Sequence, residues 1–319
     1  MNDGVTAPRG WGLMTFRPPP DGQNLPGART GGIREPLATG GLLVADGALG
    51  TMLHAKGLQR GDPPERWNLT RPQTVHEIHE AYLAVGCDLL ETNTFGANRL
   101  RLQEYGLEGR VADINGAAVQ LARRAGSAAH LVAGAVGPTG RFQGGKRKGP
   151  WSEIGSAFAE QVSHLNDGGV DLIMIETMSH LAEAQVALAG AQQGSAVPVA
   201  VSLVFFQHGR GLCTLDGASP HEAARELSAA QAVGCNCMDT ADAGEVLRQM
   251  REATALPLIA QPHAGLPDGQ EKPGIDPQNP EGWVRSLPLL LASRPAILGG
   301  CCGTTPAHLA ALVRSLARS

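Results

Sequence analysis

Residues 170–190 read VDLIMIETMSHLAEAQVALAG, and they contain one complete strand–helix unit. Residues 171–176 contain a short apolar run at 172–175, which predicts a buried β-strand that ends at Glu176. The next residues, 180–193, place apolar side chains at helical spacing. A strand followed directly by a helix is typical of the βα units that build parallel sheets.

The same alternation extends over most of the chain. β-rich runs occur at 41–46, 88–93, 130–136, 171–176, 198–205, 232–237, 257–261 and 296–300. Helical faces are marked by Val75, Ile78, His79 and Tyr82, by Val111, Ile114, Ala118 and Leu121, and by patterns at about 152–168, 180–193, 219–230, 241–254, 280–293 and 305–317. Eight such pairs in roughly 275 residues predict a (β/α)8 TIM barrel over residues 39–319. A doubly wound open sheet is the alternative, but no G-x-G-x-x-G motif follows the first run.

The first 38 residues differ from the rest in composition. They are rich in Pro, Gly and Arg, include Pro18-Pro19-Pro20 and show no periodicity. We therefore expect residues 1–38 to be a disordered or loosely docked extension outside the barrel.

Composition excludes several classes of protein. The apolar fraction is 42%, the charged fraction 18% and the net charge −4, so nothing predicts binding to nucleic acid or to a membrane surface. The basic cluster at 141–148 is interpreted as a solvated loop. No signal peptide and no apolar run of about 20 residues is present, which predicts a cytoplasmic protein with reduced thiols. The six cysteines, Cys87, Cys213, Cys235, Cys237, Cys301 and Cys302, are then thiols or metal ligands rather than disulfides.

Chemically active residues follow the strands of the predicted barrel. In TIM barrels the active site lies at the carboxyl ends of the strands. The residues found there are Asp46-Gly47, Glu91 to Asn98, Gly137-Pro138-Thr139, Glu176, Cys237, His263 and Cys301-Cys302. The arrangement predicts one site at this end of the barrel.

Three of the cysteines have the pattern of a metal site. Cys301 and Cys302 are adjacent and flanked by glycines, so both thiols can reach one ion. Cys237 ends the sixth strand, close to the eighth in a closed barrel. Thiolates suit Zn²⁺, and three protein ligands leave the open position of a catalytic zinc site. The alternative is that these are small core residues, and spacing alone does not decide between the two.

The remaining cysteines receive other interpretations. Strand alternation places Cys235 on the same side as Cys237, deeper in the barrel, as a core residue or a spare ligand. Cys87 and Cys213 are interpreted as structural.

Four motifs resemble the homocysteine S-methyltransferase family. They are Asp46-Gly47-Ala48-Leu49-Gly50-Thr51, Glu91-Thr92-Asn93-Thr94-Phe95-Gly96-Ala97-Asn98, Asn236-Cys237 and Gly299-Gly300-Cys301-Cys302-Gly303-Thr304-Thr305-Pro306. The resemblance spans about residues 41–317. Within the family, the segments Trp67-Asn68-Leu69 and Tyr105-Gly106-Leu107 are most similar to the homocysteine-binding domain of cobalamin-dependent methionine synthase.

The resemblance implies a zinc-dependent methyl transfer to homocysteine that gives methionine. It implies that Cys237, Cys301 and Cys302 bind the zinc and that the homocysteine sulfur takes the open position. Glu176 matches the residue that binds the substrate ammonium, and Asp46, Gly47 and Ala48 match the loop around its carboxylate. Glu91, Asn93 and Thr94 are expected to line the pocket.

Two segments depart from the family pattern. Pro262-His263-Ala264-Gly265 stands where methionine synthases have Pro-Asn-Ala-Gly, so His263 is either an additional zinc ligand or a loop residue. We favour the loop interpretation. Residues 201–206 are more apolar than the family's usual fifth strand, which leaves the shape of the donor side open.

The methyl donor has several candidates. Betaine-dependent relatives carry tyrosines where this chain has Gly96 and Thr177, and Trp67 alone does not make a cation–π cage. The resemblance favours a methyl-corrinoid, either on a separate protein or as free methylcobalamin. S-methylmethionine or S-adenosylmethionine is the alternative donor. Two alternatives come from other classes of protein. One is a non-catalytic subunit of a corrinoid assembly, and the other is a hydrolase or aldolase barrel with a structural metal.

Overall fold

The computed structural model describes residues 37, 41–143, 146–209, 211–265 and 279–317. Eight parallel strands form one sheet in the order β1-β12-β11-β10-β7-β6-β3-β2. A parallel bridge between Ala45 and Leu89 joins the two edges, and the Asp88 amide donates to the Val44 carbonyl at 2.7 Å. The strands are β1 (Leu43–Val44), β2 (Leu89–Glu91), β3 (Leu131–Val136), β6 (Leu172–Met178), β7 (Val199–Leu203), β10 (Ala232–Asn236), β11 (Leu258–Gln261) and β12 (Ile297–Leu298).

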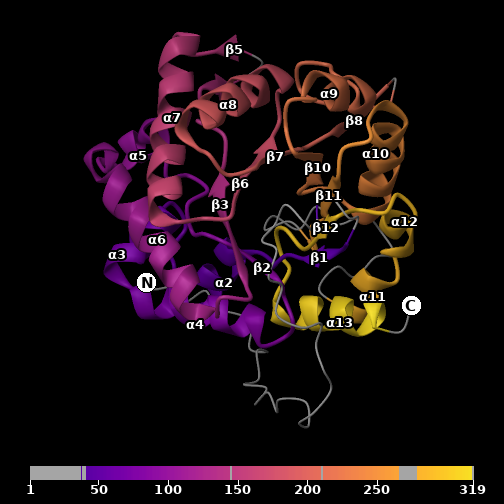
Figure 1. Ribbon diagram of the computed structural model, residues 1–319, viewed down its shortest axis with the longest axis horizontal. Coiled ribbons are helices and arrows are strands. Elements are labelled where there is room, and N and C mark those ends of the chain that lie inside the picture. Colours follow the sequence, from indigo (N-terminus) through magenta and orange to yellow (C-terminus); the bar gives the residue numbers. More distant parts are fainter. Residues whose placement is uncertain (1–36, 38–40, 144–145, 210, 266–278, 318–319) are drawn as a thin grey trace, which may run out of the picture.

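Helices surround the strands, and α13 completes the ring beside α4 (Figure 1). The α-helices are α2 (Leu49–Ala55), α3 (Trp67–Thr70), α4 (Pro72–Leu83), α5 (Arg99–Leu102), α6 (Val111–Ala125), α7 (Trp151–Gly168), α8 (Leu181–Gly194), α9 (Pro220–Glu226), α10 (Thr240–Ala253), α11 (Pro280–Val284), α12 (Pro288–Leu291) and α13 (Pro306–Leu316). Short 3-10 helices cover Pro64–Arg66, Gln103–Tyr105 and Glu108–Arg110. Within the described residues, no helix has the length and apolar character needed to span a bilayer.

Both faces of the strands are buried, which explains their continuous apolar runs. In β6, Leu172 and Met174 belong to the cluster inside the barrel. Ile173 and Ile175 belong to the cluster between the strands and the helices. One strand therefore contributes to two apolar layers, and the polar residues at its end are left at the barrel mouth.

The structure confirms the predicted barrel, and all eight predicted strands form. The predicted inner faces of α4 and α6 are buried. The single helix expected over 280–293 is wrong, because the chain forms α11 and α12 with a turn at 285–287 between them. Pro288 begins the second helix, and its missing amide hydrogen prevents the first helix from continuing through it.

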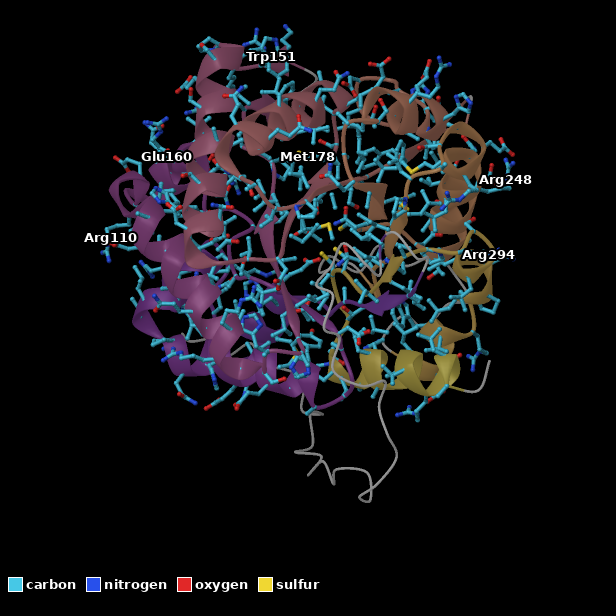
Figure 2. The ribbon with its side chains drawn as sticks, viewed as in Figure 1. Arg110, Trp151, Glu160, Met178, Arg248 and Arg294 are labelled. Carbon is cyan, nitrogen blue, oxygen red and sulfur yellow. The ribbon has the colours of Figure 1, made fainter. Side chains whose placement is uncertain are left out.

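Two antiparallel hairpins extend the loops that follow β3 and β7. In the basic segment, β4 (Phe142–Gln143) pairs with β5 (Lys146–Arg147), where only a solvated loop was expected. Lys146 and Arg147 are nevertheless exposed, and the Arg147 guanidinium stacks 4.6 Å from the ring of Trp151. Figure 2 shows Trp151 at the periphery, where Arg110 and Arg248 also point outward. The second hairpin pairs β8 (Phe206–His208) with β9 (Gly211–Cys213).

The expected extension lies almost entirely outside the described residues. Of residues 1–38 the structure describes Leu37 alone, which is 8% exposed and packs in the cluster inside the barrel.

Deletion of residues 1–36 should leave the melting temperature unchanged. Deletion of residues 1–38 should lower the free energy of unfolding by about 1.5–3 kcal/mol, because it removes a buried leucine. Equal unfolding curves for the two truncated chains would contradict a role for Leu37.

His79 on α4 predicts a pH dependence of stability. Its side chain is fully buried, and neither ring nitrogen has a hydrogen-bond partner among the described residues. Burial lowers the pKa of His79 to about 4. Between pH 6.5 and 4 the unfolded chain therefore binds a proton that the folded chain does not, and this residue's contribution to stability falls as the pH falls.

We expect the variant His79→Phe to lose this acid sensitivity. Denaturant unfolding of both proteins at pH 7 and pH 4.5 measures it. The wild type should lose about 2–3 kcal/mol more than the variant on acidification. The buried carboxyl groups titrate in both proteins and cancel in the comparison. Parallel losses would show that His79 is protonated in the folded state.

Candidate metal centre

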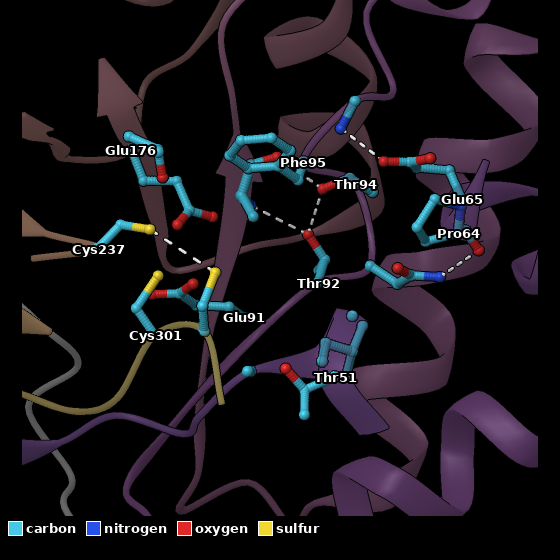
Figure 3. A pocket seen from close by; sticks show the side chains of 18 of the residues that line it. Thr51, Pro64, Glu65, Glu91, Thr92, Thr94, Phe95, Glu176, Cys237 and Cys301 are labelled. Atoms are coloured by element: carbon cyan, nitrogen blue, oxygen red, sulfur yellow. Dashed lines mark hydrogen bonds between the residues drawn. The ribbon is translucent and has the colours of Figure 1, made fainter. Parts of the chain in front are cut away.

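Three cysteine sulfurs meet at the carboxyl ends of β10 and β12. Cys237 follows β10, and Cys301 and Cys302 follow β12. The three Sγ atoms lie within 4.8 Å of one another, and those of Cys237 and Cys302 are 3.6 Å apart. Figure 3 shows the sulfurs of Cys237 and Cys301 facing the same space.

These sulfurs fit a tetrahedral metal ion. With zinc–sulfur bonds of 2.3 Å, two ligand sulfurs lie about 3.8 Å apart, close to the separation found here between Cys237 and Cys302. Thiolates are soft ligands and select zinc over magnesium or calcium. Among the described residues no histidine or carboxylate joins the group, so three protein ligands leave one position for another molecule.

Local backbone geometry brings the cysteines together. Cys237 has φ 57°, a left-handed conformation that is rare for a residue with a side chain and that is found most often at functional sites. In the second loop, a Cβ on Gly300 would lie 2.5 Å from the Thr304 hydroxyl. Thr304 donates that hydroxyl to the Cys301 carbonyl at 2.7 Å, which fixes the tight turn that presents both cysteines.

The three thiols titrate as a group. Hydrogen bonds from Cys237 and Cys301 lower the pKa of Cys302 to about 3. Its hydrogen bond with Cys237 raises the pKa of Cys301 well above the usual value. For Cys237, the hydrogen bond with Cys301 lowers the pKa, but the bond with Cys302 and burial outweigh it and raise the pKa to about 12. The opposite directions of these shifts arise from hydrogen bonds among the three sulfurs, so the titrations of the three thiols are coupled.

The structure corrects the expected position of Cys235. This residue packs between the barrel and α10, and its thiol points to the Ala243 carbonyl at 3.8 Å, away from the barrel interior. The alternation argument fails because β10 ends at Asn236, so Cys237 no longer follows the strand geometry. Cys235 is thus a core residue and not a spare ligand.

The other cysteines and His263 lie outside the sulfur group. Cys87 is buried in the core and Cys213 is half-buried in β9. The His263 Nδ1 atom accepts the Gly265 amide at 3.1 Å within its loop.

A cavity of about 380 Å³ adjoins the sulfurs. Glu176 and Glu91 border it on the side of the cysteines, whereas Pro64 and Glu65 border the opposite side (Figure 3). Arg101 is the basic residue among the described residues that line it, and its guanidinium already pairs with Glu104 at 3.0 Å. In the part of the chain that the structure describes, the inner cavity therefore presents carboxyl groups and no basic side chain.

Burial raises the pKa of three neighbouring carboxyl groups, and two of them, Glu91 and Glu176, line the cavity. The pKa of Glu176 is raised well above the usual range, first by burial and then by the charges of Glu91, Cys302 and Asp46. Burial and the charge of Glu91 raise the pKa of Asp46 in the same way, and burial raises that of Glu91. A cationic group on a ligand would favour the charged forms of these carboxyl groups and lower their pKa values.

Most of the predicted substrate residues border the cavity. They are Gly47, Ala48, Glu91, Asn93, Thr94 and Glu176. Asp46 is 2% exposed and does not line it; its Oδ2 atom accepts the Glu91 amide at 3.1 Å. The Ala48 amide donates to the Thr304 hydroxyl at 3.0 Å.

Asn93 and Thr94 also hold the loop after β2. The Asn93 amide group donates to the Pro64 carbonyl at 2.9 Å. The Thr94 hydroxyl donates to the Ala135 carbonyl at 2.7 Å.

Several residues at the site were not predicted from the sequence. They include Arg101 and Tyr105 of the cavity lining and the buried Glu65, which accepts the Gly96 amide at 2.6 Å. Glu65 has no sequence signal, because it lies in a connection rather than at a strand end. Asn236 did have a sequence signal, because it lies at the carboxyl end of β10 beside Cys237.

Comparisons with known proteins point to one family. A family model described as homocysteine S-methyltransferase matches residues 43–316. The methionine synthases of Mycobacterium leprae (strain TN) and Mycobacterium tuberculosis (strain ATCC 25618 / H37Rv) are each 30% identical, over 87% and 86% of this chain. The chain spans about a quarter of the length of these relatives, 24% and 25%.

Among solved structures, the homocysteine methyltransferase MmuM from Escherichia coli is similar over nearly its whole length. Its metallated form gives a TM-score of 0.71 at 26% identity, covering 87% of this chain and 96% of that one. Its oxidized form gives a TM-score of 0.72 with the same coverage.

Proposed function

Because the chain belongs to the homocysteine S-methyltransferase family, we propose that it transfers a methyl group to the thiol of homocysteine and so forms methionine, with zinc as its metal. The observation that carries the proposal is the meeting of three cysteine sulfurs with buried carboxyl groups at one cavity. Sulfur ligands suit the metal, and the carboxyl groups suit the ammonium of an amino acid.

The cysteines serve the acceptor half of the reaction. A free thiol with a pKa near 8.5 is mostly protonated at neutral pH and is a poor nucleophile. Bound zinc would deprotonate the substrate thiol and hold it as a thiolate. Cys237, Cys301 and Cys302 would hold the ion as three anionic ligands, and the substrate sulfur would then keep enough electron density to attack.

Glu176 is proposed to bind the substrate ammonium. Glu176 is 9% exposed, borders the cavity and lies on the side of the sulfurs. The cationic ligand would hold Glu176 in its charged form and orient the substrate thiol toward the cysteines. Gly47 and Ala48 are proposed to face the substrate carboxylate. In the transfer, the new sulfur–methyl bond forms as the donor–methyl bond breaks, and the donor keeps the electron pair.

We propose a methyl-corrinoid as donor, carried by a separate protein or supplied as free methylcobalamin. The similarity to methionine synthases supports this choice, and Gly96 and Thr177 leave the cavity wall without aromatic rings at these positions. S-methylmethionine or S-adenosylmethionine is the second candidate. It is the alternative that the family resemblance leaves open, and this chain covers 96% of MmuM, a homocysteine methyltransferase.

Separate assays with each donor distinguish these candidates. With homocysteine as acceptor, we expect methylcobalamin to give methionine, betaine to be inactive, and removal of zinc to abolish the reaction. A much higher kcat/KM with S-methylmethionine than with methylcobalamin would replace the corrinoid by a sulfonium donor. It would leave the acceptor half of the site unchanged. No methyl transfer with any donor would contradict the proposed activity.

A further inference from the structure

Asn236 lies between the sulfur group and Glu176. It is the last residue of β10, directly before Cys237, and it is fully buried. Its side chain contacts both halves of the site: Nδ2 lies 3.3 Å from Glu176 Oε2 and 3.8 Å from Cys301 Sγ. Neither the metal ligands nor the ammonium partner alone explains a buried amide at this position.

The orientation of the Asn236 amide follows from its other partners. Its Oδ1 atom accepts the backbone amide of Thr177 at 2.9 Å and the hydroxyl of Ser202 at 2.9 Å. A backbone amide can only donate, so the atom that faces Thr177 is oxygen. The NH2 group must therefore face Glu176 and Cys301.

The NH2 group has fewer hydrogens than acceptors. Thr177 Oγ1 lies at 2.7 Å and takes one hydrogen. The second hydrogen is shared by the Glu176 carboxylate and the Cys301 sulfur. A primary amide has only two hydrogens, so a stronger bond to one of these acceptors weakens the bond to the other.

Asn236 also supports the unusual backbone on both sides of the site. Thr177 has φ 60° and Cys237 has φ 57°, both left-handed; Thr177 follows Glu176, and Cys237 belongs to the sulfur group. The bond from the Thr177 amide to Asn236 Oδ1 holds the first of these conformations. The second begins where β10 ends at Asn236. One side chain thus fixes Glu176 and Cys301 relative to each other.

We propose that Asn236 is a positioning residue that couples recognition of the substrate ammonium to the metal centre. The inference rests on the proposed function. When a ligand ammonium binds Glu176, the carboxylate turns its lone pairs to the ligand. The second N–H of Asn236 then donates its hydrogen bond to the Cys301 sulfur alone. A hydrogen bond to that thiolate reduces its negative charge and favours an additional sulfur ligand. A thiol ligand without an ammonium leaves this N–H shared between Glu176 and Cys301.

Cobalt-loaded protein tests this coupling, because sulfur–cobalt charge-transfer absorption reports the thiolates directly. Two ligands are titrated: homocysteine, and 4-sulfanylbutanoate, which lacks only the amino group. In Asn236→Ala the Kd of homocysteine should rise about 10- to 100-fold, and that of 4-sulfanylbutanoate less than about 3-fold. The absorption shift that homocysteine causes in the wild type should become equal to that caused by 4-sulfanylbutanoate.

Cys235→Ala is the matched control, one residue away on β10 with its side chain toward α10. It should leave both Kd values unchanged. Equal weakening of both ligands in Asn236→Ala, or an unchanged homocysteine shift, would overturn the coupling. If Asn236→Ala does not fold, Asn236→Ser carries the same comparison. Failure of the wild type to bind homocysteine through cobalt would instead contradict the proposed function.

Discussion

Replacement of Cys302 with alanine is expected to remove most of the zinc and to abolish methyl transfer. Purified wild-type protein should contain about one zinc per chain, because three thiolates form a complete protein ligand set for a catalytic site. Two thiolates would leave a bound ion with two open positions, and zinc affinity depends on every protein ligand. Zinc measured by inductively coupled plasma mass spectrometry should fall to a small fraction per chain.

The same loss is expected for Cys301→Ala, whereas Cys213→Ser is the matched control. Cys213 is a half-buried thiol in β9 outside the sulfur group, so its replacement should leave zinc content and activity unchanged. Circular dichroism shows whether each variant is folded. Full zinc retention in folded Cys301→Ala or Cys302→Ala would contradict the three-thiolate centre.

The second large effect is expected for Glu176→Gln. This substitution keeps the size of the side chain and removes its charge, at a position 9% exposed beside the cavity. A hydrogen bond between charged groups contributes about 1.5–3 kcal/mol, so homocysteine binding should weaken about 10- to 150-fold. Isothermal titration of zinc-loaded protein measures this change.

Zinc content separates this effect from damage to the metal centre. Glu176 is not a member of the sulfur group, so the variant should retain the zinc of the wild type. Binding of 4-sulfanylbutanoate should change little, because that ligand has no ammonium. If Glu176→Gln bound homocysteine as the wild type does, Glu176 would not be the ammonium partner.

The barrel could be predicted from the sequence because its strands are buried on both faces. Runs such as residues 172–175 are apolar throughout, and each precedes a helix with one apolar face. The break at Pro288 was missed because the apolar spacing continues through the turn. Periodicity reports which face is buried, but it does not report the loss of one backbone donor.

The site could be predicted only in part for a related reason. Strand ends placed Cys237, Cys301 and Cys302 together. Alternation placed Cys235 and Cys237 on the same side of the strand. The left-handed backbone at Cys237 breaks that alternation, and the sequence does not indicate it. The role of Asn236 depends on which atoms surround its amide, and Glu65 reaches the cavity from a connection far from any strand end. Such contacts follow from tertiary packing.

Zinc K-edge X-ray absorption of the purified protein, with and without homocysteine, tests the central claim most directly. The three cysteine sulfurs at the ends of β10 and β12 predict a zinc with three sulfur neighbours near 2.3 Å in the free protein. Homocysteine should increase the number of sulfur neighbours to four. A first shell dominated by nitrogen or oxygen, or one that does not change when homocysteine is added, would contradict the account.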